Sequence, residues 1–240
     1  LKYLRILLKE FIHNGGVYIE DCRIISVDKK NETLIATTNK GSIHSRYLIY
    51  ATHIPPGRNI IHFRNTPYRS YVMAVKLKSG HYPEALGYDL FEPYHYYRTH
   101  NIDGEDFLIA GGEDHKTGYV DNASDCFERL ESYLRRHFDI ENIAYKWSSQ
   151  FYEPADGLPY IGHLPGNPEN VYFATGYSGT GMIFGTLAAK ILNDVILKGN
   201  SIYEELFLTS RVKPVSGFNN IVKEAADKNN IIESDCTHLH

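Results

Sequence analysis

A strand, a glycine-rich turn and a helix follow one another near the C-terminal end of the chain, and this segment carries the strongest chemical signal. Residues 171–175 are apolar and predict a strand, which leads into the run GYSGTGMIFG that begins at Gly176. Glycines at this point let a ligand approach the backbone, because no side chain stands in the way. The helix beyond them would direct unpaired N–H groups and the positive end of its dipole at that ligand. The segment therefore suits a flat or anionic cofactor edge, although close packing of helix against strand would also favour small residues.

The spacing of these glycines differs from the fingerprint of dinucleotide-binding proteins. Read from Gly176, the pattern is G-x-x-G-x-G-x-x-x-G, and no acidic residue follows at the distance of a ribose contact. The turn is therefore predicted to meet a cofactor through its backbone without supplying the usual pyrophosphate loop.

Composition excludes several classes of partner. The formal charge is −4, from 25 Lys and Arg against 29 Asp and Glu, so the clustered positive field that nucleic acid needs is not expected. No apolar run approaches the length of a membrane span, so a membrane partner is not expected either. Cys22, Cys126 and Cys236 are odd in number and far apart, which argues against a disulfide framework and favours a cytoplasmic location.

The order of expected elements predicts an α/β protein with an α+β part. A first helix carries Leu4, Leu7, Leu8 and Phe11 on one face and ends at residues 14–16. A second helix covers about 123–138, with Asn122 as its cap and an inner face of Phe127, Leu130, Leu134 and Phe138. Strands are expected at residues 17–27, 34–38, 47–51, 70–77, 94–99, 107–111, 147–152 and 171–175.

Two long motifs carry a resemblance to a known family. WSSQFYEPADGLPYIG (147–162) and NVYFATGYSGTGM (170–182) resemble the FAD-dependent oxidoreductases of the D-amino acid oxidase and glycine oxidase superfamily. GGEDHKTG (111–118), ATHIPP (51–56) and PYRSYVMAV (67–75) are similar to its branch with a C-terminal Rieske iron–sulfur domain. The resemblance covers roughly residues 1–225. It implies the C-terminal portion of a Rossmann-like FAD-binding fold with an antiparallel substrate domain, lacking the N-terminal GxGxxG unit.

The same resemblance implies a domain division and a cofactor. Residues 1–58 would be a partial FAD-binding domain, 59–148 the substrate domain, 149–213 a return to the FAD-binding domain, and 214–240 a linker. FAD would be surrounded by Ile24 (at adenine, unless it is simply a core residue), Ala51, Thr52, Gly157, Leu158, Gly176, Tyr177, Ser178, Gly179, Thr180, Gly181 and Met182. Because the pyrophosphate contacts are missing, we expect this chain by itself to bind FAD weakly or not at all.

The substrate implied by the resemblance is a small amine or amino acid that delivers hydride to flavin N5. Amino acid oxidases place an arginine four residues after the tryptophan, where its planar fork binds the substrate carboxylate. Counting from Trp147, Phe151 stands there, so a polyamine, an N-substituted amine or an amine with a distant carboxylate is as plausible as an α-amino acid. Gln150 and Tyr177 are the catalytic candidates, and the electron acceptor is not identified.

Other residues leave alternatives open. The aromatic segment 88–97 could roof a pocket for an apolar or cationic substrate, or simply fill a sheet. His53 either approaches the cofactor or caps a strand, and His115 is interpreted as structural. Cys236 and His238 resemble half of a Rieske ligand set, so a [2Fe–2S] cluster is expected only in a longer parent protein, and no metal site is expected in this chain. The alternative to an oxidoreductase is a non-catalytic fragment that serves as a structural or interaction module.

Overall fold

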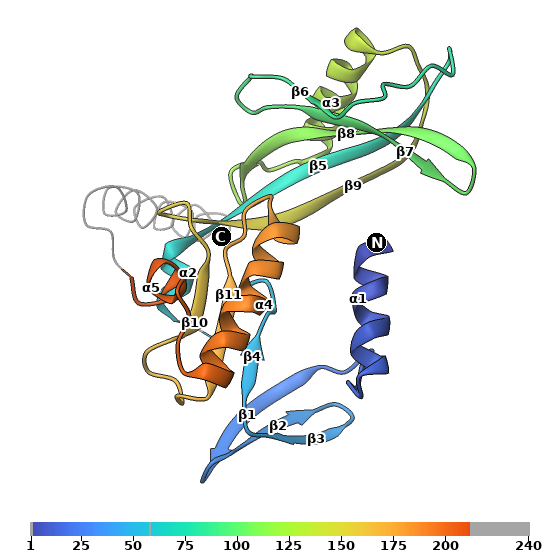
Figure 1. Cartoon of the computed structure of the whole chain (residues 1–240). Helices are drawn as coiled ribbons and strands as arrows, with labels where there is room; N and C mark the ends of the chain where they lie inside the picture. Colours follow the sequence, from blue (N-terminus) through green and yellow to red (C-terminus); the bar gives the residue numbers. More distant parts are fainter. Residues whose placement is uncertain (1, 58, 212–240) are drawn as a thin grey trace. The chain divides into compact units, whose positions relative to one another are not determined.

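The structure is a computed structural model that describes residues 2–57 and 59–211. The chain divides into two compact units, Leu1–Ile49 with Gly166–Val171 and Tyr50–Pro165 with Tyr172–His240. Figure 1 labels the elements of both units, which are described separately below. None of the helices among the described residues is long and apolar enough to cross a bilayer.

The first unit contains one helix and a three-stranded antiparallel sheet. Helix α1 (Lys2–His13) ends where Gly15 adopts a φ of 87°, as the sequence predicts. Strands β1 (Ile24–Lys30), β2 (Thr33–Thr38) and β3 (Gly41–Ser45) follow in the order β1-β2-β3. No residue of α1 is buried among the described residues, although the sequence predicts an apolar face on this helix.

The strand predicted at residues 17–27 is wrong in its first half. Strand β1 begins only at Ile24, because Asp21 turns the chain with a φ of 50°. The Asn39 side chain accepts a hydrogen bond from Arg23 N at 2.7 Å and donates one to Asp21 O at 3.0 Å. These backbone groups bond to a side chain instead of entering a sheet ladder, which the apolar pattern of residues 17–20 does not reveal.

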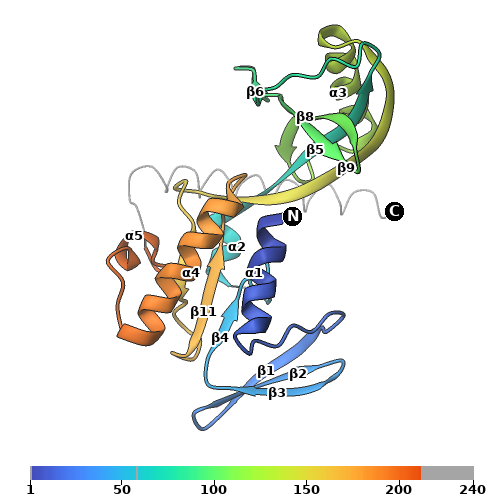
Figure 2. The ribbon, with the colours of Figure 1, turned by 45° about the vertical axis from the view of Figure 1, so that its right-hand side comes forward.

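The second unit is built on a five-stranded antiparallel sheet in the order β6-β7-β8-β5-β9. Four of its strands are longer than predicted: β5 (Asn65–Leu77), β7 (Tyr96–Ile102), β8 (Glu105–Lys116) and β9 (Ile140–Pro154). The short strand β6 (Gly87–Tyr88) was not predicted. β5 and β9 pair along almost their whole lengths and lie side by side in Figure 2. β9 also runs through the predicted domain boundary at residue 148 without a break.

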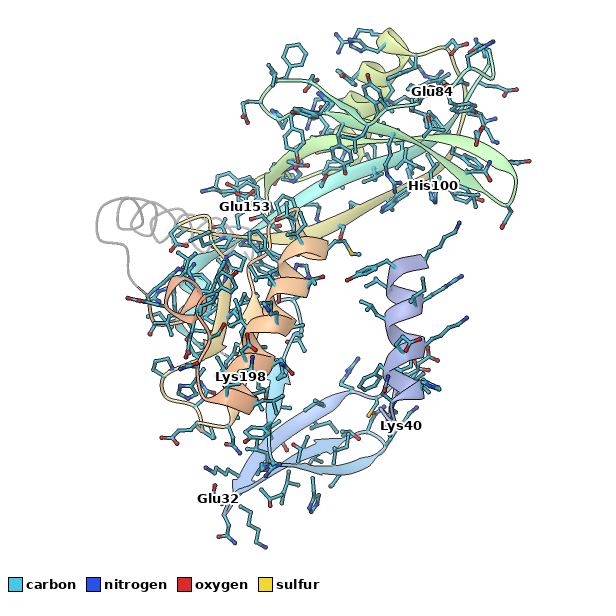
Figure 3. All side chains as sticks on the ribbon, in the orientation of Figure 1. Glu32, Lys40, Glu84, His100, Glu153 and Lys198 are labelled. Carbon is cyan, nitrogen blue, oxygen red and sulfur yellow. The ribbon has the colours of Figure 1, made fainter. Side chains whose placement is uncertain are left out.

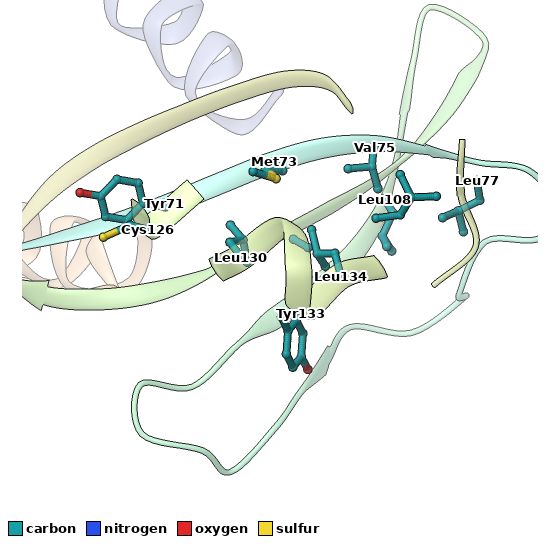
Figure 4. Close-up of a cluster of buried hydrophobic side chains, with 11 residues drawn as sticks. Tyr71, Met73, Val75, Leu77, Leu108, Cys126, Leu130, Tyr133 and Leu134 are labelled. Atoms are coloured by element: carbon teal, nitrogen blue, oxygen red, sulfur yellow. The ribbon is translucent and has the colours of Figure 1, made fainter. Parts of the chain in front are cut away.

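Helix α3 (Ala123–His137) covers one face of this sheet. Its predicted cap is confirmed, since the Asn122 side chain accepts a hydrogen bond from Ser124 N at 3.0 Å. Leu130 and Leu134 are fully buried against alternate residues of β5. Figure 4 shows this cluster, which contains Tyr71, Met73, Val75, Leu77, Leu108, Ala110, Cys126, Leu130, Tyr133, Leu134 and Ile140.

On the opposite face of the sheet, no helix between residues 59 and 211 packs on the same strands, and we call it the open face. It is defined by a smaller cluster made of Val72, Ala74, Phe107 and Ile109. Because side chains alternate along paired strands, Ser70 and Tyr68 of β5 lie on this face too, opposite Ser149 and Phe151 of β9. The Tyr68 and Phe151 rings stack with their centroids 5.7 Å apart.

The second unit also contains a small antiparallel sheet with a long helix packed against it. β10 (Tyr160–His163) pairs antiparallel with β11 (Val171–Thr175), and α4 (Gly181–Lys198) packs on β10 and β11 through Ala188, Ile191 and Leu192. Strand β4 (Leu48–Tyr50) ends with Tyr50, whose ring stacks on Phe173 at 5.2 Å. Two short helices, α2 (Ile60–Arg64) and α5 (Glu204–Phe207), complete the unit.

Replacing Leu134 with alanine tests whether the α3 cluster stabilises the second unit. Leu134 is 0% exposed, so Leu134→Ala leaves a cavity and should lower the free energy of unfolding by about 2–5 kcal/mol. Leu90 is 92% exposed, so the control Leu90→Ala should stay within about 0.5 kcal/mol of the native protein. Urea denaturation followed by circular dichroism measures both, and equal losses would contradict the packing described here.

Candidate active site

Gly176 lies where β11 ends and must be glycine for reasons of packing. Its φ is 78°, in the left-handed region that favours glycine. A Cβ atom there would lie 2.6 Å from Asn65 Oδ1 and 2.8 Å from Pro154 Cγ. The turn is therefore seated tightly against the first residue of β5 and the last residue of β9.

Packing does not explain the later glycines, Gly179, Gly181 and Gly185. A Cβ atom on Gly179 or Gly185 would meet nothing within 4 Å among the described residues. On Gly181 it would meet only Tyr177 Cδ2, at 3.9 Å. Packing within the described chain does not require glycine at these positions, which leaves room for a flat ligand against the backbone.

The start of α4 leaves its first N–H groups without a side-chain cap. The Thr180 hydroxyl donates to Tyr177 O at 2.9 Å instead of capping the helix. No acidic residue lies in the first turn. The positive end of the helix dipole therefore lies at the open part of the turn, where it would stabilise negative charge on a ligand.

The segment of Ala51 and Thr52 is tied to the same turn. His53 has a φ of 69°, and its carbonyl accepts a hydrogen bond from the Thr175 hydroxyl. Its ring meets the Tyr152 ring edge to face, with centroids 4.9 Å apart. The positive φ is a conformation that favours glycine. The hydrogen bond from the Thr175 hydroxyl to the His53 carbonyl gives His53 a structural role at the end of β11.

A buried ion pair holds the loop after β9. The Asp156 carboxylate accepts two hydrogen bonds from Arg211, from Nε and Nη2, both at 2.7 Å. The two side chains are only 6% and 8% exposed. Arg211 Nη1 also donates to Pro159 O at 2.7 Å, and Nη2 donates to Leu158 O. Its guanidinium lies 4.1 Å from the centroid of the Tyr160 ring.

Gly157 and the turn converge on the end of β9. Gly157 has a φ of 76°, and its N–H donates to Pro154 O at 3.0 Å. Ser178 N donates to Tyr152 O at 3.1 Å, so the glycine turn contacts the same strand end. Figure 3 shows Glu153 at this point. The predicted positions 51–52, 157–158 and 176–182 are therefore brought together in one unit.

The two catalytic candidates have different surroundings. Gln150 lies opposite Arg69, on the other side of β9 from Phe151, and its amide donates to the Tyr152 hydroxyl at 3.2 Å. Tyr177 packs against the α4 core, and burial raises its pKa to about 12. The Tyr177 hydroxyl therefore stays protonated at neutral pH and can act as a hydrogen-bond donor but not as a base.

Ile24 belongs to the first unit, apart from the other predicted cofactor residues. It is 43% exposed, so it is not a core residue of the described chain. An open cavity of about 650 Å³ is lined by Asp21, Cys22, Arg23, Ile25 and Asn39, and Ile24 is not among its lining residues.

Asn65 is a residue that sequence reasoning missed. It is 1% exposed, and neither Oδ1 nor Nδ2 has a hydrogen-bond partner among the described residues. A buried amide without partners is uncommon in proteins, and Oδ1 of this one lies 2.6 Å from where a Cβ atom on Gly176 would stand. A single asparagine gives no signal in the sequence, because its neighbour Gly176 lies more than a hundred residues away along the chain.

No group of three metal-ligating side chains occurs among the described residues. Cys236 and His238 lie outside the described residues.

Comparison with known proteins places these features in a family context. Residues 1–195 match the family described as FAD dependent oxidoreductase. Over 229 residues the chain is 31% identical to YhfW of Bacillus subtilis (strain 168), named as a Rieske 2Fe-2S iron-sulfur protein. That match covers 95% of this chain and 45% of the relative, so the chain spans less than half of the relative's length.

Solved structures share the fold at low sequence identity. Glycine oxidase from Geobacillus kaustophilus has a TM-score of 0.64 at 15% identity, over 83% of this chain and 55% of that chain. L-amino acid deaminase from Proteus vulgaris has a TM-score of 0.63 at 14% identity, over 86% of this chain and 61% of that chain.

Removal of Arg211 tests whether the buried ion pair fixes the loop at residues 156–158. Arg211→Ala leaves the Asp156 carboxylate buried without its partner, and we expect a loss of about 3–5 kcal/mol in the free energy of unfolding. The control Lys198→Ala breaks the solvent-screened i,i+4 pair with Asp194 and should change the free energy of unfolding far less than Arg211→Ala does. Urea denaturation gives both values, and a loss as small as that of the control would contradict this role.

Proposed function

Because the chain belongs to the family of FAD-dependent oxidoreductases, we propose that it acts in the oxidation of a C–N bond in a small amine or amino acid, with FAD as cofactor. The observation that carries this proposal is the turn at residues 176–182, where Gly179 and Gly181 leave the backbone uncovered. The uncapped start of α4 lies in the same turn.

The residues around the turn at 176–182 suit the ring of a flavin. The backbone of residues 176–182 would hold the pyrimidine edge of the ring, with Ala51, Thr52, Gly157 and Leu158 beside it. The Asn65 amide has no hydrogen-bond partner within residues 2–57 and 59–211, and it supports the fit because a cofactor or water at the turn would satisfy its polar atoms. Ile24 would meet the adenine end through its main chain. When bound, the flavin supplies a hydride acceptor at N5.

The helix dipole of α4 supplies the electrostatics that this chemistry needs. The chemistry that a bound flavin would supply places negative charge at its pyrimidine edge, which residues 176–182 would face. Oriented N–H groups and the positive end of a helix stabilise such a charge without reorganising. Thr180 leaves these N–H groups available, because its hydroxyl bonds elsewhere.

Gln150 and Tyr177 are proposed to position groups rather than to transfer protons. The Tyr177 hydroxyl stays protonated and would donate a hydrogen bond. Gln150 would act through Tyr152, to which its amide donates. Orientation of the amine is the main requirement for hydride transfer, so no dedicated base is assigned.

The predicted division of the chain is kept as part of this proposal. Residues 59–148 would form the substrate domain, with 1–58 and 149–213 on the FAD side and 214–240 as a linker. A [2Fe–2S] cluster is proposed only as a cofactor of a longer parent protein, in which Cys236 and His238 would supply half of the ligands, and no electron acceptor is assigned.

The exposed face of α1 favours the alternative role of a non-catalytic interaction module. Leu4, Leu7 and Phe11 are each about half exposed, and together they form an apolar stripe. An interaction module would keep this surface but would show no saturable binding of flavin.

Flavin binding by the Gly179→Val variant tests the proposed cofactor site. Valine would fill the space over the turn and should weaken FAD binding by about tenfold or more, because overpacking costs on the order of 1–3 kcal/mol. Equilibrium dialysis against FAD, read from the visible flavin absorbance of the protein, measures affinity even if it is weak. Riboflavin should respond to the substitution in the same way, since the turn contacts the ring.

Leu197→Val is the matched control, because Leu197 is exposed near the other end of the same helix. It should bind FAD as the native chain does. Equal flavin affinity for the native chain and Gly179→Val would rule out the turn as the ring site. Absence of saturable FAD binding to the native chain would favour the interaction module.

A further inference from the structure

The GGEDHKTG segment (111–118) contains a β-bulge that changes which side chains reach each face of the sheet. Arg69 pairs with His115 and Tyr71 pairs with Gly112, so Glu113 and Asp114 together oppose the single residue Ser70. Glu113 adopts a φ of 59°, a strained value for a residue with a side chain. An extra residue in one strand redirects the side chains around it, and bulges of this kind are frequent next to active sites.

The bulge directs Glu113 toward α3, where a polar network holds it. Glu113 Oε2 accepts from Arg129 Nε at 2.6 Å, and Oε1 lies 3.4 Å from His95 Nε2. The His95 ring stacks on Tyr133 with centroids 3.7 Å apart, and its Nδ1 lies 2.9 Å from Asp89 Oδ2. These contacts offset the strain at Glu113 and fix the bulge.

Asp114 is directed the other way, onto the open face beside Ser70. Neither Asp114 Oδ1 nor Ser70 Oγ has a hydrogen-bond partner of good geometry among the described residues. Burial raises the pKa of the Asp114 carboxyl above its usual value, and the nearby Ser70 hydroxyl and His115 offset part of this effect. A partly buried carboxylate with an unsatisfied oxygen destabilises the fold, which a cationic ligand would relieve.

Two tyrosines, Tyr94 and Tyr96, lie near enough to this carboxylate for its charge to act on them. The Tyr96 ring lies across Gly111, where a Cβ atom would approach within 2.4 Å of it, and the Tyr94 ring is 6.0 Å from Tyr96. Burial raises the pKa of Tyr94, and the charges of Asp114 and Glu153 raise it further, so both carboxylates lie near this ring. Tyrosine faces together with carboxylates attract ammonium groups and repel carboxylates.

Phe151 also lies on the open face. It pairs with Tyr68, two residues before Ser70 on β5, and stacks on the Tyr68 ring, so this position supplies an apolar ring and no positive charge for a carboxylate. Arg98 follows two residues after Tyr96 on the same face of β7, and its charge partly offsets the burial that raises the pKa of Tyr96, so this surface carries a cation as well as the Asp114 carboxylate.

We propose that Asp114, Tyr94 and Tyr96 form a subsite for a cationic group, and that the substrate is an amine with a second positive charge, such as a diamine, rather than an α-amino acid. This inference rests on the proposed oxidoreductase function. One amino group, deprotonated, would be oxidised, while the distal ammonium would bind to the Asp114 carboxylate. Glu113 is then a positioning residue, because it acts only through the bulge.

Isothermal titration calorimetry of the chain at neutral pH, without flavin, tests the subsite with three probes of similar length. Putrescine carries two ammonium groups, butylamine carries one, and γ-aminobutyrate replaces the second with a carboxylate. We expect putrescine to bind about tenfold or more tightly than butylamine, as a hydrogen bond to a charged group would give. γ-Aminobutyrate should bind most weakly.

Asp114→Asn should abolish the preference for putrescine, whereas the matched control Asp121→Asn, at an exposed aspartate outside the sheet, should keep it. Asp114→Asn should unfold at the same temperature as the native chain or higher, because it removes an incompletely satisfied carboxylate. Phe151→Arg gives a second variant, in which putrescine affinity should fall and γ-aminobutyrate affinity should rise.

Equal affinities of the native chain for putrescine and butylamine would overturn the inference, and so would an unchanged preference in folded Asp114→Asn. Because calorimetry needs no flavin, the two proposals can fail separately. A putrescine preference that depends on Asp114, found with no saturable FAD binding, would contradict only the proposed function. FAD binding that Gly179→Val weakens, found without a putrescine preference, would contradict only the subsite.

Discussion

The ion pair between Arg211 and Asp156 is the interaction on which the geometry of the candidate site depends. Its guanidinium joins the end of the described chain to the loop after β9 and to the carbonyls of Leu158 and Pro159. Arg64 is also buried, and it donates to Thr209 O at 2.9 Å and Arg211 O at 3.2 Å, which fixes the same terminal segment. Charges placed so far from water require complete pairing, so the loop has little freedom to move.

Strands β5 and β9 transmit this order to the rest of the second unit. Each begins or ends at the glycine turn and continues without interruption beneath α3. One face of β5 is buried in the α3 cluster and the other carries the open-face residues. The same pair of strands therefore supports the proposed cofactor turn at one end and the proposed substrate surface farther along.

Local signals predicted much of this architecture. The cap at Asn122, the buried stripe of α3 and the strand–turn–helix around Gly176 each depend on neighbouring residues, and the structure contains all three. Features that depend on distant residues could not be predicted. Arg211 and Asp156 are 55 positions apart, and the strand expected at residues 17–20 is absent because Asn39 bonds the backbone beyond it. Apolar patterns do not encode such side-chain contacts.

The bulge at Glu113 also makes the chemistry of the open face sensitive to chain length. Removing one residue from this part of β8 would restore regular alternation opposite Ser70 and could bring a different side chain to the surface. A deletion of this kind changes the charge that a ligand meets without any substitution at the contact position. Insertions and deletions in this strand, as well as point changes, would then be a route by which proteins of this architecture diverge in the molecules they accept.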